Sequence, residues 1–448
     1  MISQLKVIET VSIIRQKFCS SIEQSLFFVL ALDYLTATVF NHLFPLNQSN
    51  RMINLHARGI TGIQSKTFDN YHRRIRTINL SSNSLSYLPK EIFQIFRKTL
   101  INLNLQGNRF ESLQRNSFLR SLQQLRILDL SGNRLKMLWK ENFRGLKRLK
   151  TLIVRENQLT HLSYATFRHC RMMTTLDLSD NQISSIDFNA FHLLNYLKIL
   201  LLNNNPLGQR SLSNHLLKPL TNLQYLDLEN TQLENLSSFL FVHNQRLRSI
   251  KLRRNTFHLN MTLKRTFCKA NSLIEIDLVN TNIQTLDICT YHQLPSLRRL
   301  YLMSNPLDCT CDLFYLKYGD IYRLLSVDGN GFEQLESKVD MQLNRWISRP
   351  ELYRHVEKAF VRGDLTRLPI DLSMFARCAK PQEWNGYEIN NITGVYSQCR
   401  YRWMMIEHQC RNYCQEENFI ETSLNSSTGS RFWISFFVCF LPVIISQN

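Results

Sequence analysis

The 448-residue sequence lacks the short motifs that mark the common classes of enzyme. It has no GxSxG nucleophile turn, no phosphate-binding GxxxxGK loop and no zinc-binding HExxH helix. His169 and Cys170 are adjacent, but neighbours in sequence face different directions, so we do not expect them to act as a nucleophile and its base. The sequence therefore predicts a protein that is not an enzyme, with no cofactor and no bound metal.

Acidic residues are also in short supply. Asp and Glu total 35 against 54 Lys and Arg, which gives a net charge of +19. Such an excess favours acidic partners, for example sulfated glycans, anionic membrane or nucleic acid. Because the basic residues come without an aromatic stacking platform, nucleic acid is not expected as a partner.

What the sequence does contain is a repeat of 24 to 26 residues. The segment LRILDLSGNRLKML, from Leu125 to Leu138, follows the pattern L-x-x-L-x-L-x-x-N-x-L-x-x-L. The same frame begins again at Ile75, Leu100, Leu149, Met173, Leu197, Leu223, Leu247, Leu273 and Leu297. A weaker unit comes before these ten, around Ile53, Leu55 and Ile60, with Arg58 in place of the Asn.

Each unit is typical of a short strand, a turn at the Asn and a looser return segment. The inward leucines of one unit cannot be buried by that unit alone, so the units are expected to stack into one continuous core. The Asn side chains would lie inside the turns and bond backbone groups that the coil leaves unpaired. They are Asn83, Asn108, Asn133, Asn157, Asn181, Asn205, Asn255 and Asn305, with Thr231 and Thr281 in the same place in two units.

Residues 52–308 resemble the extracellular leucine-rich repeat arrays of Toll-type receptors, Slit and adhesion ectodomains, some of them anchored by glycosylphosphatidylinositol. The resemblance rests on the 24-residue spacing and on a phenylalanine late in the unit, at Phe93, Phe118, Phe143, Phe167, Phe191 and Phe241. It implies an α/β-type solenoid, a curved leucine-rich repeat array with a concave parallel sheet and a disulfide-bonded C-terminal cap.

The motif N-P-x-x-C-x-C, residues 305–311, ends the last repeat and begins the cap in this family. The resemblance implies the disulfides Cys309–Cys378 and Cys311–Cys399, although the sequence alone permits other pairings. The cap would occupy residues 309–415. An insertion at about 319–377 departs from the shorter connection that the family usually has.

Two more cysteines, Cys410 and Cys414, are expected to form a further disulfide, with each other or with cap partners. The alternative is a zinc site that combines them with His408 and the two cysteines of the N-P-x-x-C-x-C motif. That motif lacks the C-x2-C spacing of most zinc fingers, and disulfides fit an extracellular array better.

The remaining cysteines within the repeats receive different predictions. Cys268 and Cys289 fall on the return side of consecutive units and are candidates to bridge each other. Cys170 occupies the apolar position of Leu146 and Leu194 in neighbouring units, so it is expected to be a buried free thiol.

Six N-x-S/T sequons are candidate glycosylation sites if the protein is secreted. They are Asn47, Asn79, Asn235, Asn260, Asn391 and Asn425. Asn79 is expected on the concave strand of its unit, where a glycan would obstruct a ligand near the first repeats.

The two ends of the chain suggest targeting segments. Residues 416–431 read as a polar stalk, and the apolar tail 432–448 is shorter than the roughly 20 residues of a membrane helix. The layout fits a glycosylphosphatidylinositol signal with attachment at Asn425, Ser426 or Ser427, and the alternatives are a short membrane span or a buried segment. In the N-terminal segment 1–51, residues 25–40 are a candidate signal or anchor core that Asp33 interrupts.

The concave face would be formed by the x positions of the strand pattern, because side chains alternate along a strand. The candidate ligand-binding residues there are Arg248, Lys251, Arg253, Arg254, Arg298, Arg299 and Tyr301. Aspartates recur at one equivalent position and are expected to form a column, at Asp129, Asp177, Asp227 and Asp277.

The leading functional hypothesis is a cell-surface recognition, adhesion or receptor-type protein that binds a protein ligand or co-receptor on the concave face, attached to the membrane through its C-terminal tail. A second hypothesis is binding of glycosaminoglycan or matrix through the basic residues named above. A third, of another class, is an intracellular leucine-rich repeat adaptor.

Overall fold

The computed structural model describes most of the repeat region and several short segments after it. The described residues are 34–36, 38–40, 51–69, 74–113, 118–208, 212–258, 263, 265–311, 313, 371–372, 378–380, 385, 406, 409–410 and 413–414. The chain divides into two compact units, Met1–Cys414 and Gln415–Asn448. The second unit, which contains the predicted stalk, lipid-anchor residues and apolar tail, lies outside the described residues.

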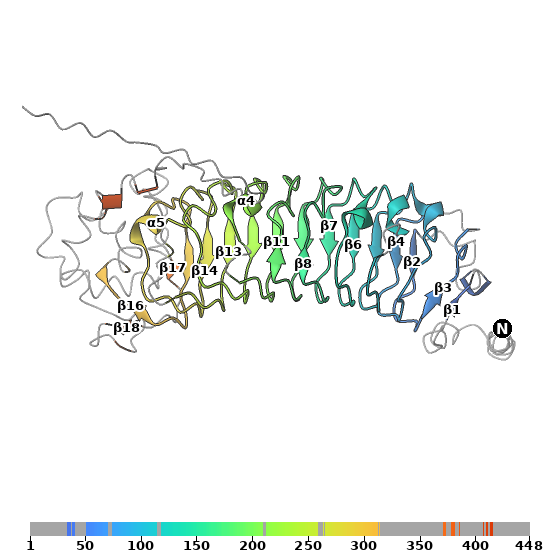
Figure 1. Ribbon diagram of the computed structural model, residues 1–448, viewed down its shortest axis with the longest axis horizontal. Coiled ribbons are helices and arrows are strands. Elements are labelled where there is room, and N and C mark those ends of the chain that lie inside the picture. Colours follow the sequence, from blue (N-terminus) through green and yellow to red (C-terminus); the bar gives the residue numbers. More distant parts are fainter. Residues whose placement is uncertain are drawn as a thin grey trace, which may run out of the picture. The chain divides into compact units, whose positions relative to one another are not determined.

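One parallel sheet of twelve short strands runs through the repeat region (Figure 1). Its strands are β2 (Met52–Asn54), β4 (Thr77–Asn79), β5 (Asn102–Asn104), β6 (Ile127–Asp129), β7 (Thr151–Ile153), β9 (Thr175–Asp177), β11 (Ile199–Leu201), β12 (Tyr225–Asp227), β13 (Ser249–Lys251), β14 (Glu275–Asp277), β15 (Arg299–Tyr301) and β17 (Asp371–Leu372). They lie in chain order, so the ten predicted repeats and the weaker first one each contribute one strand. The predicted solenoid is confirmed.

Alternation along each strand decides what the core contains. The middle residue of β6, Leu128, is fully buried, whereas the preceding Ile127 is 40% exposed on the other side of the sheet. The register places Leu128 between Leu103 and Leu152, so the middle residues form a continuous buried row. Burying one leucine side chain contributes about 1.5–3 kcal/mol, and stacking the repeats makes that burial possible.

The predicted asparagine ladder holds the repeats together at the turn after each strand. In Asn133 the Nδ2 group donates to the carbonyl of Leu130 in its own repeat, at 2.9 Å, and to that of Leu105 in the preceding repeat, at 3.1 Å. Its Oδ1 accepts from the Phe110 amide at 3.1 Å. Thr231 replaces this amide with a hydroxyl, which lies 2.7 Å from the Leu228 carbonyl. The asparagine thus ties two adjacent turns to each other.

The residue before each ladder position adopts a left-handed backbone, with φ between 52° and 64°. These residues are Ala57, Ser82, Gly107, Gly132, Glu156, Asp180, Asn204, Asn230, Arg254, Asn280 and Ser304. Only two of them are glycine, the residue that tolerates this conformation without strain. The conformation is imposed by the repeat, because the turn recurs whichever side chain is present.

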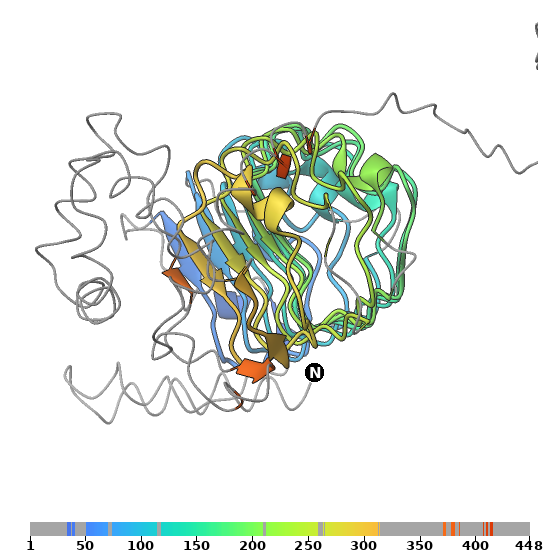
Figure 2. The ribbon, with the colours of Figure 1, turned by 90° about the vertical axis from the view of Figure 1, so that its left-hand side faces the viewer.

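The return segments close each turn of the coil opposite the sheet (Figure 2). They include the short helices η1 (Gln94–Phe96), η2 (Phe118–Ser121), η3 (Lys140–Phe143), α4 (Asn214–Leu217) and α5 (Ile288–His292), and a two-stranded parallel pair of β8 (His161–Leu162) with β10 (Ser185–Ile186). The late phenylalanines stack from unit to unit inside the coil, with ring centroids of Phe143 and Phe167 5.8 Å apart. These aromatic contacts add to the burial of the leucine rows.

The N-terminal end of the array is covered by residues from the predicted signal or anchor core. Strand β1 (Tyr34–Leu35) pairs in parallel with β3 (Gly62–Ile63) of the first repeat. Leu35 and Phe40 are fully buried, and the Phe40 ring meets the edge of Phe68 at a centroid distance of 4.8 Å. The described part of this stretch therefore packs against the first repeat.

At the other end, the chain folds back on the last repeats. Strand β16 (Leu307–Asp308) pairs with β18 (Cys378–Lys380), and the Cys309–Cys378 disulfide joins the same two segments, in the pairing that the resemblance implies. Cys311 is also disulfide-bonded, while its expected partner Cys399 lies outside the described residues. Within the predicted insertion, β17 extends the main sheet beyond β15.

The pairing of the other four cysteines differs from the prediction. Cys289 is bonded to Cys410 and Cys268 to Cys414, so Cys410–Cys414 and Cys268–Cys289 were wrong. The reason is positional. Cys268 directly follows Phe267, whereas Cys289 precedes the aligned Tyr291 by two residues, so the two do not face each other across the stack. Each instead faces a different point on the 406–414 segment.

No helix within the described part of the chain is both long and apolar enough to span a membrane. Cys170 is fully buried and is the free cysteine among the described residues, as the repeat pattern predicts. Burial raises the pKa of its thiol to about 12, so the thiolate that a nucleophile needs is suppressed.

Candidate ligand-binding surface

The outward side of the twelve-stranded sheet, called here the sheet face, is the surface on which the predicted ligand-binding residues lie. In each strand the residues on either side of the buried middle position point outward, which gives two parallel rows of side chains. Neighbouring strands are about 4.8 Å apart, so a row places one side chain at each such step. The character of these rows changes along the array.

The central part of the first row carries no charge. We call the side chains of Ile127, Thr151, Thr175, Ile199 and Tyr225 the central row; the register places them side by side on β6, β7, β9, β11 and β12. Ile127 is 40% and Ile199 36% exposed. In the second row beside them, the half-buried Ile153 and Leu201 alternate with aspartates, at Asp129, Asp177 and Asp227. Ile199 and Tyr225 adjoin each other, and Thr151 and Thr175 lie between Ile199 and Ile127.

Tyr225 stands where the central row meets charged residues. Its hydroxyl is 3.2 Å from Asp227 Oδ2, and the Lys251 ammonium lies 5.6 Å from the ring centroid. Burial is the main cause that raises the Tyr225 pKa, and the hydrogen bond with Tyr225 is the main cause that raises the pKa of Lys251. These contacts fix the ring in one orientation, which is a property of aromatic anchors in protein interfaces.

Beyond Tyr225, charge alternates in sign from repeat to repeat. We call this part the charge lattice: acidic Asp227 and Glu229, basic Lys251, Arg253 and Arg254, acidic Glu275 and Asp277, then basic Arg299. Each basic side chain pairs with a carboxylate of an adjacent repeat. The distances are 3.8 Å for Lys251–Asp227, 3.2 Å for Arg253–Asp277, 3.6 Å for Arg254–Glu229 and 2.8 Å for Arg299–Glu275.

Most of the predicted basic cluster therefore lies on the sheet face, where four of its residues are matched by carboxylates. Of the others, Arg248 is exposed in the segment just before β13, outside the sheet face, and Arg298 donates to the carbonyls of Pro295 and Leu297, at 3.2 and 2.9 Å. Tyr301 is half-buried on β15, in register with Asp277. A surface of interleaved opposite charges suits a protein with complementary charges better than a uniform polyanion.

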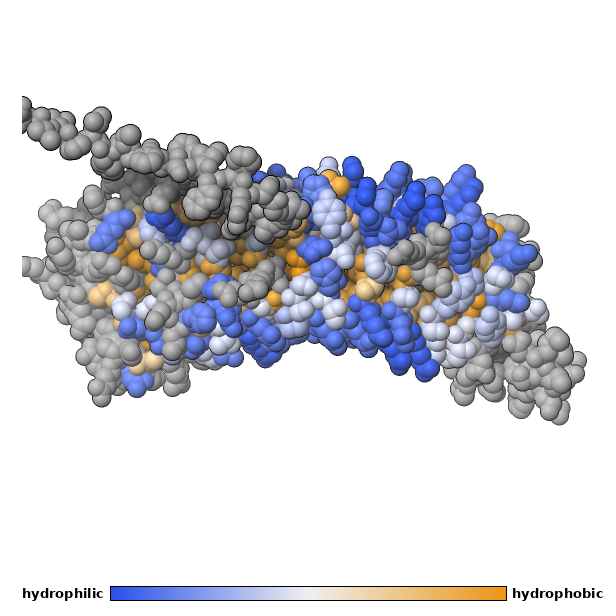
Figure 3. All heavy atoms as spheres, viewed as in Figure 1, coloured by the Kyte–Doolittle hydropathy of each residue, from blue (hydrophilic) through white to orange (hydrophobic). Residues whose placement is uncertain are grey.

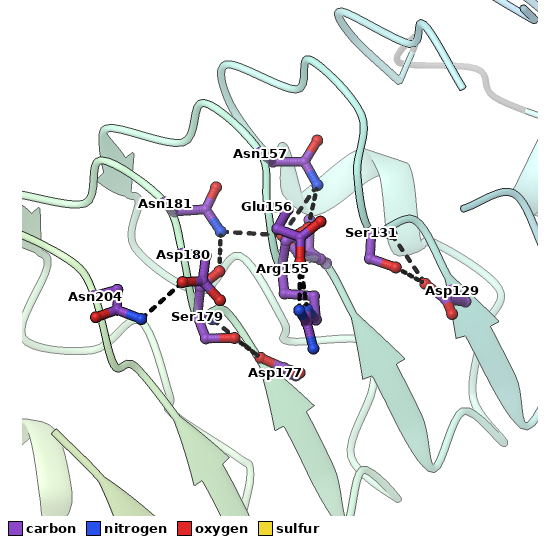
Figure 4. A network of polar contacts seen from close by, with 11 residues as sticks. Asp129, Ser131, Arg155, Glu156, Asn157, Asp177, Ser179, Asp180, Asn181 and Asn204 are labelled. Atoms are coloured by element: carbon purple, nitrogen blue, oxygen red, sulfur yellow. Dashed lines mark hydrogen bonds and ion pairs between the residues drawn. The ribbon is translucent and has the colours of Figure 1, made fainter. Parts of the chain in front are cut away.

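The aspartate column has a structural task. In each aspartate, Oδ1 accepts a hydrogen bond from the backbone amide two residues later. Asp177 Oδ1, for example, accepts hydrogen bonds from the backbone amide of Ser179 at 3.0 Å and from its hydroxyl at 2.6 Å (Figure 4). Asp129 makes the same pair of bonds with Ser131. These carboxylates cap the turn that leaves the strand, and only their second oxygens face a ligand.

The turn next to this column carries further polar contacts. Arg155 forms an ion pair with Glu156, the residue in the left-handed position, and Asn204 donates to Asp180 Oδ1 at 2.7 Å (Figure 4). The hydrogen bond to Glu156 is the main cause that raises the Arg155 pKa. This edge of the sheet face is thus polar but internally paired.

Sequence reasoning located the basic residues on the sheet face but missed the central row. The signal was present: the residue before the buried middle position of the strand is isoleucine, threonine or tyrosine in five consecutive repeats. Which carboxylate would meet which basic side chain depended on the register of neighbouring strands, which only the folded structure supplies.

Comparison with known families agrees with the repeat pattern. The model described as leucine rich repeat matches residues 98–159 and 147–207, and that of the BspA type leucine rich repeat region, in six copies, matches residues 206–315. The chain is a leucine-rich repeat protein. Leucine-rich repeat proteins typically have no enzymatic activity, in keeping with the catalytic motifs that this sequence lacks.

This leucine-rich repeat protein is similar to individual known proteins over limited lengths. Nephrocan of Mus musculus is 33% identical over 82 residues, which cover 18% of this chain and 15% of nephrocan. The Toll chain in the Toll–Spatzle complex of Drosophila has a TM-score of 0.56 at 19% identity, with 81% of this chain and 50% of that chain covered. A chain of the mouse RP105/MD-1 complex has a TM-score of 0.52 at 19% identity, with 77% of this chain and 54% of that chain covered. These likenesses concern the fold.

The other predicted sites of the leucine-rich repeat protein stand as follows. Asn79 and Asn235 are half-buried, on β4 and in a return segment, whereas Asn47, Asn260, Asn391 and Asn425 lie outside the described residues, as do Ser426 and Ser427. Within the described part of the chain, no three His, Cys, Asp or Glu side chains group in a way that would hold a metal ion. Disulfide bonding of Cys410 and Cys414 removes the thiolates that the zinc alternative required.

Proposed function

We propose that this leucine-rich repeat protein is an extracellular recognition protein that binds a protein ligand on the sheet face, with the central row as the apolar centre of the contact and the charge lattice on one side of it. The observation that carries the proposal is the central row itself. Ile127 and Ile199 stay exposed although the fold has a buried core in which to place aliphatic side chains. An exposed apolar centre with a paired, polar surround has the anatomy of a protein interface.

The charge lattice contributes specificity in this proposal. Its carboxylates and basic groups alternate across the repeats, so a ligand must present charges in the matching order. In these ion pairs the carboxylates of Asp227 and Asp277 are largely buried, whereas the basic side chains are about a third or more exposed, so a ligand carboxylate can reach the basic groups from solvent. Toll and RP105 have been solved in complexes with Spatzle and MD-1, respectively.

The disulfides support the extracellular setting. Three described bonds join residues that are 69 to 146 positions apart in sequence, and such bonds persist in oxidising compartments. Their presence argues against the intracellular adaptor. Attachment to the membrane through the C-terminal tail stays a prediction, which release of the protein from intact cells by a phosphatidylinositol-specific phospholipase would test.

The proposal is tested by a binding screen of the full chain against an array of extracellular protein domains, repeated with two variants. Ile199→Asp places a charge in the central row, and Phe188→Asp does so at a return-segment side chain that is 63% exposed. We expect Ile199→Asp to weaken binding of any captured ligand about thirtyfold, because a central contact is worth about 2 kcal/mol, while Phe188→Asp leaves it unchanged. Equal binding by the wild type and Ile199→Asp would remove the sheet face from the interaction.

A further inference from the structure

The positive charge of the array is gathered on one edge, away from the sheet face. In seven consecutive repeats, the segment that leads from the return side of the coil to the start of the next strand contains Lys and Arg but no Asp or Glu. These segments, which we call the entry edge, are residues 97–101, 119–126, 144–150, 168–174, 192–198, 218–224 and 242–248. Together they hold fourteen Lys or Arg, and all fourteen side chains are exposed.

The remainder of residues 97–248 has the opposite balance, with seven Lys or Arg and ten Asp or Glu. Ion pairs such as Lys136–Glu111 and Arg155–Glu156 belong to that remainder. The segregation shows that the net charge of +19 is not spread evenly over the coil. It forms a strip that follows the direction in which the repeats stack.

The fold places this strip on one side of the coil. The segments run from the short return-side helices to the strands, and Figure 2 shows α4 and α5 along the upper side of the coil. In Figure 3, hydrophilic side chains line both margins of the array, the lower one and the part of the upper one that is coloured. Neighbouring repeats are aligned closely enough that Arg148 donates to Gln124 Oε1, one repeat away, at 2.7 Å.

Local electrostatics agree with a positive strip. Burial lowers the pKa of His169, and the guanidinium groups of Arg168 and Arg144 lower it further; Glu141 opposes them, and Arg171 adds a smaller lowering effect. Three arginines from two adjacent repeats thus act on the same imidazole. Their joint field is what a bound anion would experience.

We infer that the entry edge binds a linear sulfated polysaccharide laid along the stack of repeats. Seven strands separated by about 4.8 Å give a strip about 29 Å long, which suits an extended, regularly charged chain. Tyr196 is the one aromatic residue in the seven segments, so a platform for stacking bases is missing. In the oxidising compartment that the disulfides indicate, a sulfated glycan is the polyanion whose chemistry fits. This site is separate from the sheet face.

The test compares binding of the full chain to a heparin oligosaccharide before and after two matched sets of charge reversals. The first set, Lys147→Glu, Arg148→Glu and Lys150→Glu, lies on the entry edge. The second set, Arg109→Glu, Arg134→Glu and Lys136→Glu, changes equally exposed residues that follow the ladder asparagines. Both sets lower the net charge from +19 to +13, because each reversal removes two charges. Circular dichroism verifies that both variants are folded.

We expect the wild type to bind with an affinity that falls steeply with salt, and the entry-edge set to weaken binding by about tenfold or more. The second set should change it less than about threefold. Equal losses in the two sets would show attraction to net charge alone and overturn the proposal. Absence of binding by the wild type, or tighter binding to phosphatidylserine vesicles than to heparin, would also overturn it, and neither result bears on the sheet-face ligand.

Discussion

Asp277 shows how one residue serves both the fold and the surface. Its Oδ1 accepts the Val279 amide at 3.1 Å, which caps the turn, and its Oδ2 lies 3.2 Å from Arg253 Nε in the charge lattice. Burial raises its pKa above the ordinary 3.8, although the hydrogen bond from Val279 and the charge of Arg253 oppose the change. The carboxylate is therefore held ionised at a cost to stability.

Replacement of Asp277 by Asn should relieve this cost. An amide oxygen can accept the same backbone bond, as Asn79 and Asn104 do for Ser81 N and Gln106 N at the equivalent position. At neutral pH we expect Asp277→Asn to unfold at the same or a slightly higher urea concentration than the wild type. Asp277→Ala, which removes the cap, should lose about 1 kcal/mol.

The pH dependence of stability in the wild type and in Asp277→Asn tests the direction of the Asp277 pKa shift. A folded-state pKa above the unfolded value means that the folded protein binds the proton more tightly, so the wild type loses stability relative to Asp277→Asn as pH rises from 3.8 through the raised pKa. Urea unfolding of both proteins from acidic to neutral pH measures the difference. A difference that grows in favour of the wild type with rising pH would contradict the assignment of burial as the main cause.

At the scale of the element, the strand, its turn and the ladder asparagine act as one unit. Asn255 illustrates this: Nδ2 donates to the carbonyls of Leu252 and Leu228, at 2.7 and 2.8 Å, and Oδ1 accepts from the amides of Thr231 and Leu233, each at 3.0 Å. The side chain is 1% exposed. Water therefore cannot replace these bonds if the amide is removed.

Asn255→Ala should lower the free energy of unfolding by at least about 3 kcal/mol, because several buried backbone groups in two repeats lose their partner. Urea denaturation followed by circular dichroism measures the change. Asn271→Ala, at an exposed position just before the next strand, is the matched control and should stay within about 0.5 kcal/mol of the wild type. If the two variants were equally stable, the ladder would contribute little to the fold.

At the scale of the whole molecule, Cys410 and Cys414 tie the part of the chain after the repeats to the end of the array. Disulfides attach them to Cys289 and Cys268, respectively, in two successive repeats. Between these bonds Arg265 lies 4.7 Å from the centroid of the Tyr413 ring and 6.0 Å from that of Phe239. Burial is the main cause that raises the Tyr413 pKa, followed by the negative charge of Asp287. These bonds and contacts hold Cys410, Tyr413 and Cys414 against the last repeats.

The double variant Cys268→Ser and Cys414→Ser should lower the free energy of unfolding by about 2–4 kcal/mol, because a cross-link between distant positions no longer restricts the unfolded chain. Hydrogen exchange should accelerate mainly in the last repeats, since each repeat contacts only its neighbours. Peptide mapping without reduction should find the Cys289–Cys410 peptide intact. Accelerated exchange spread evenly over the array would show that the clamp is not local.

The sequence by itself determined the repeat frame, the buried rows and the asparagine ladder, because each follows from a period that ten units restate. Even the burial of Cys170 followed from its position in that frame. Only the tertiary structure decided which residues of different parts of the chain form ion pairs and disulfides with each other. Which carboxylate neutralises Arg253 and which cysteine meets Cys268 depend on strand register and on a segment more than a hundred residues away, and no local pattern encodes those distances.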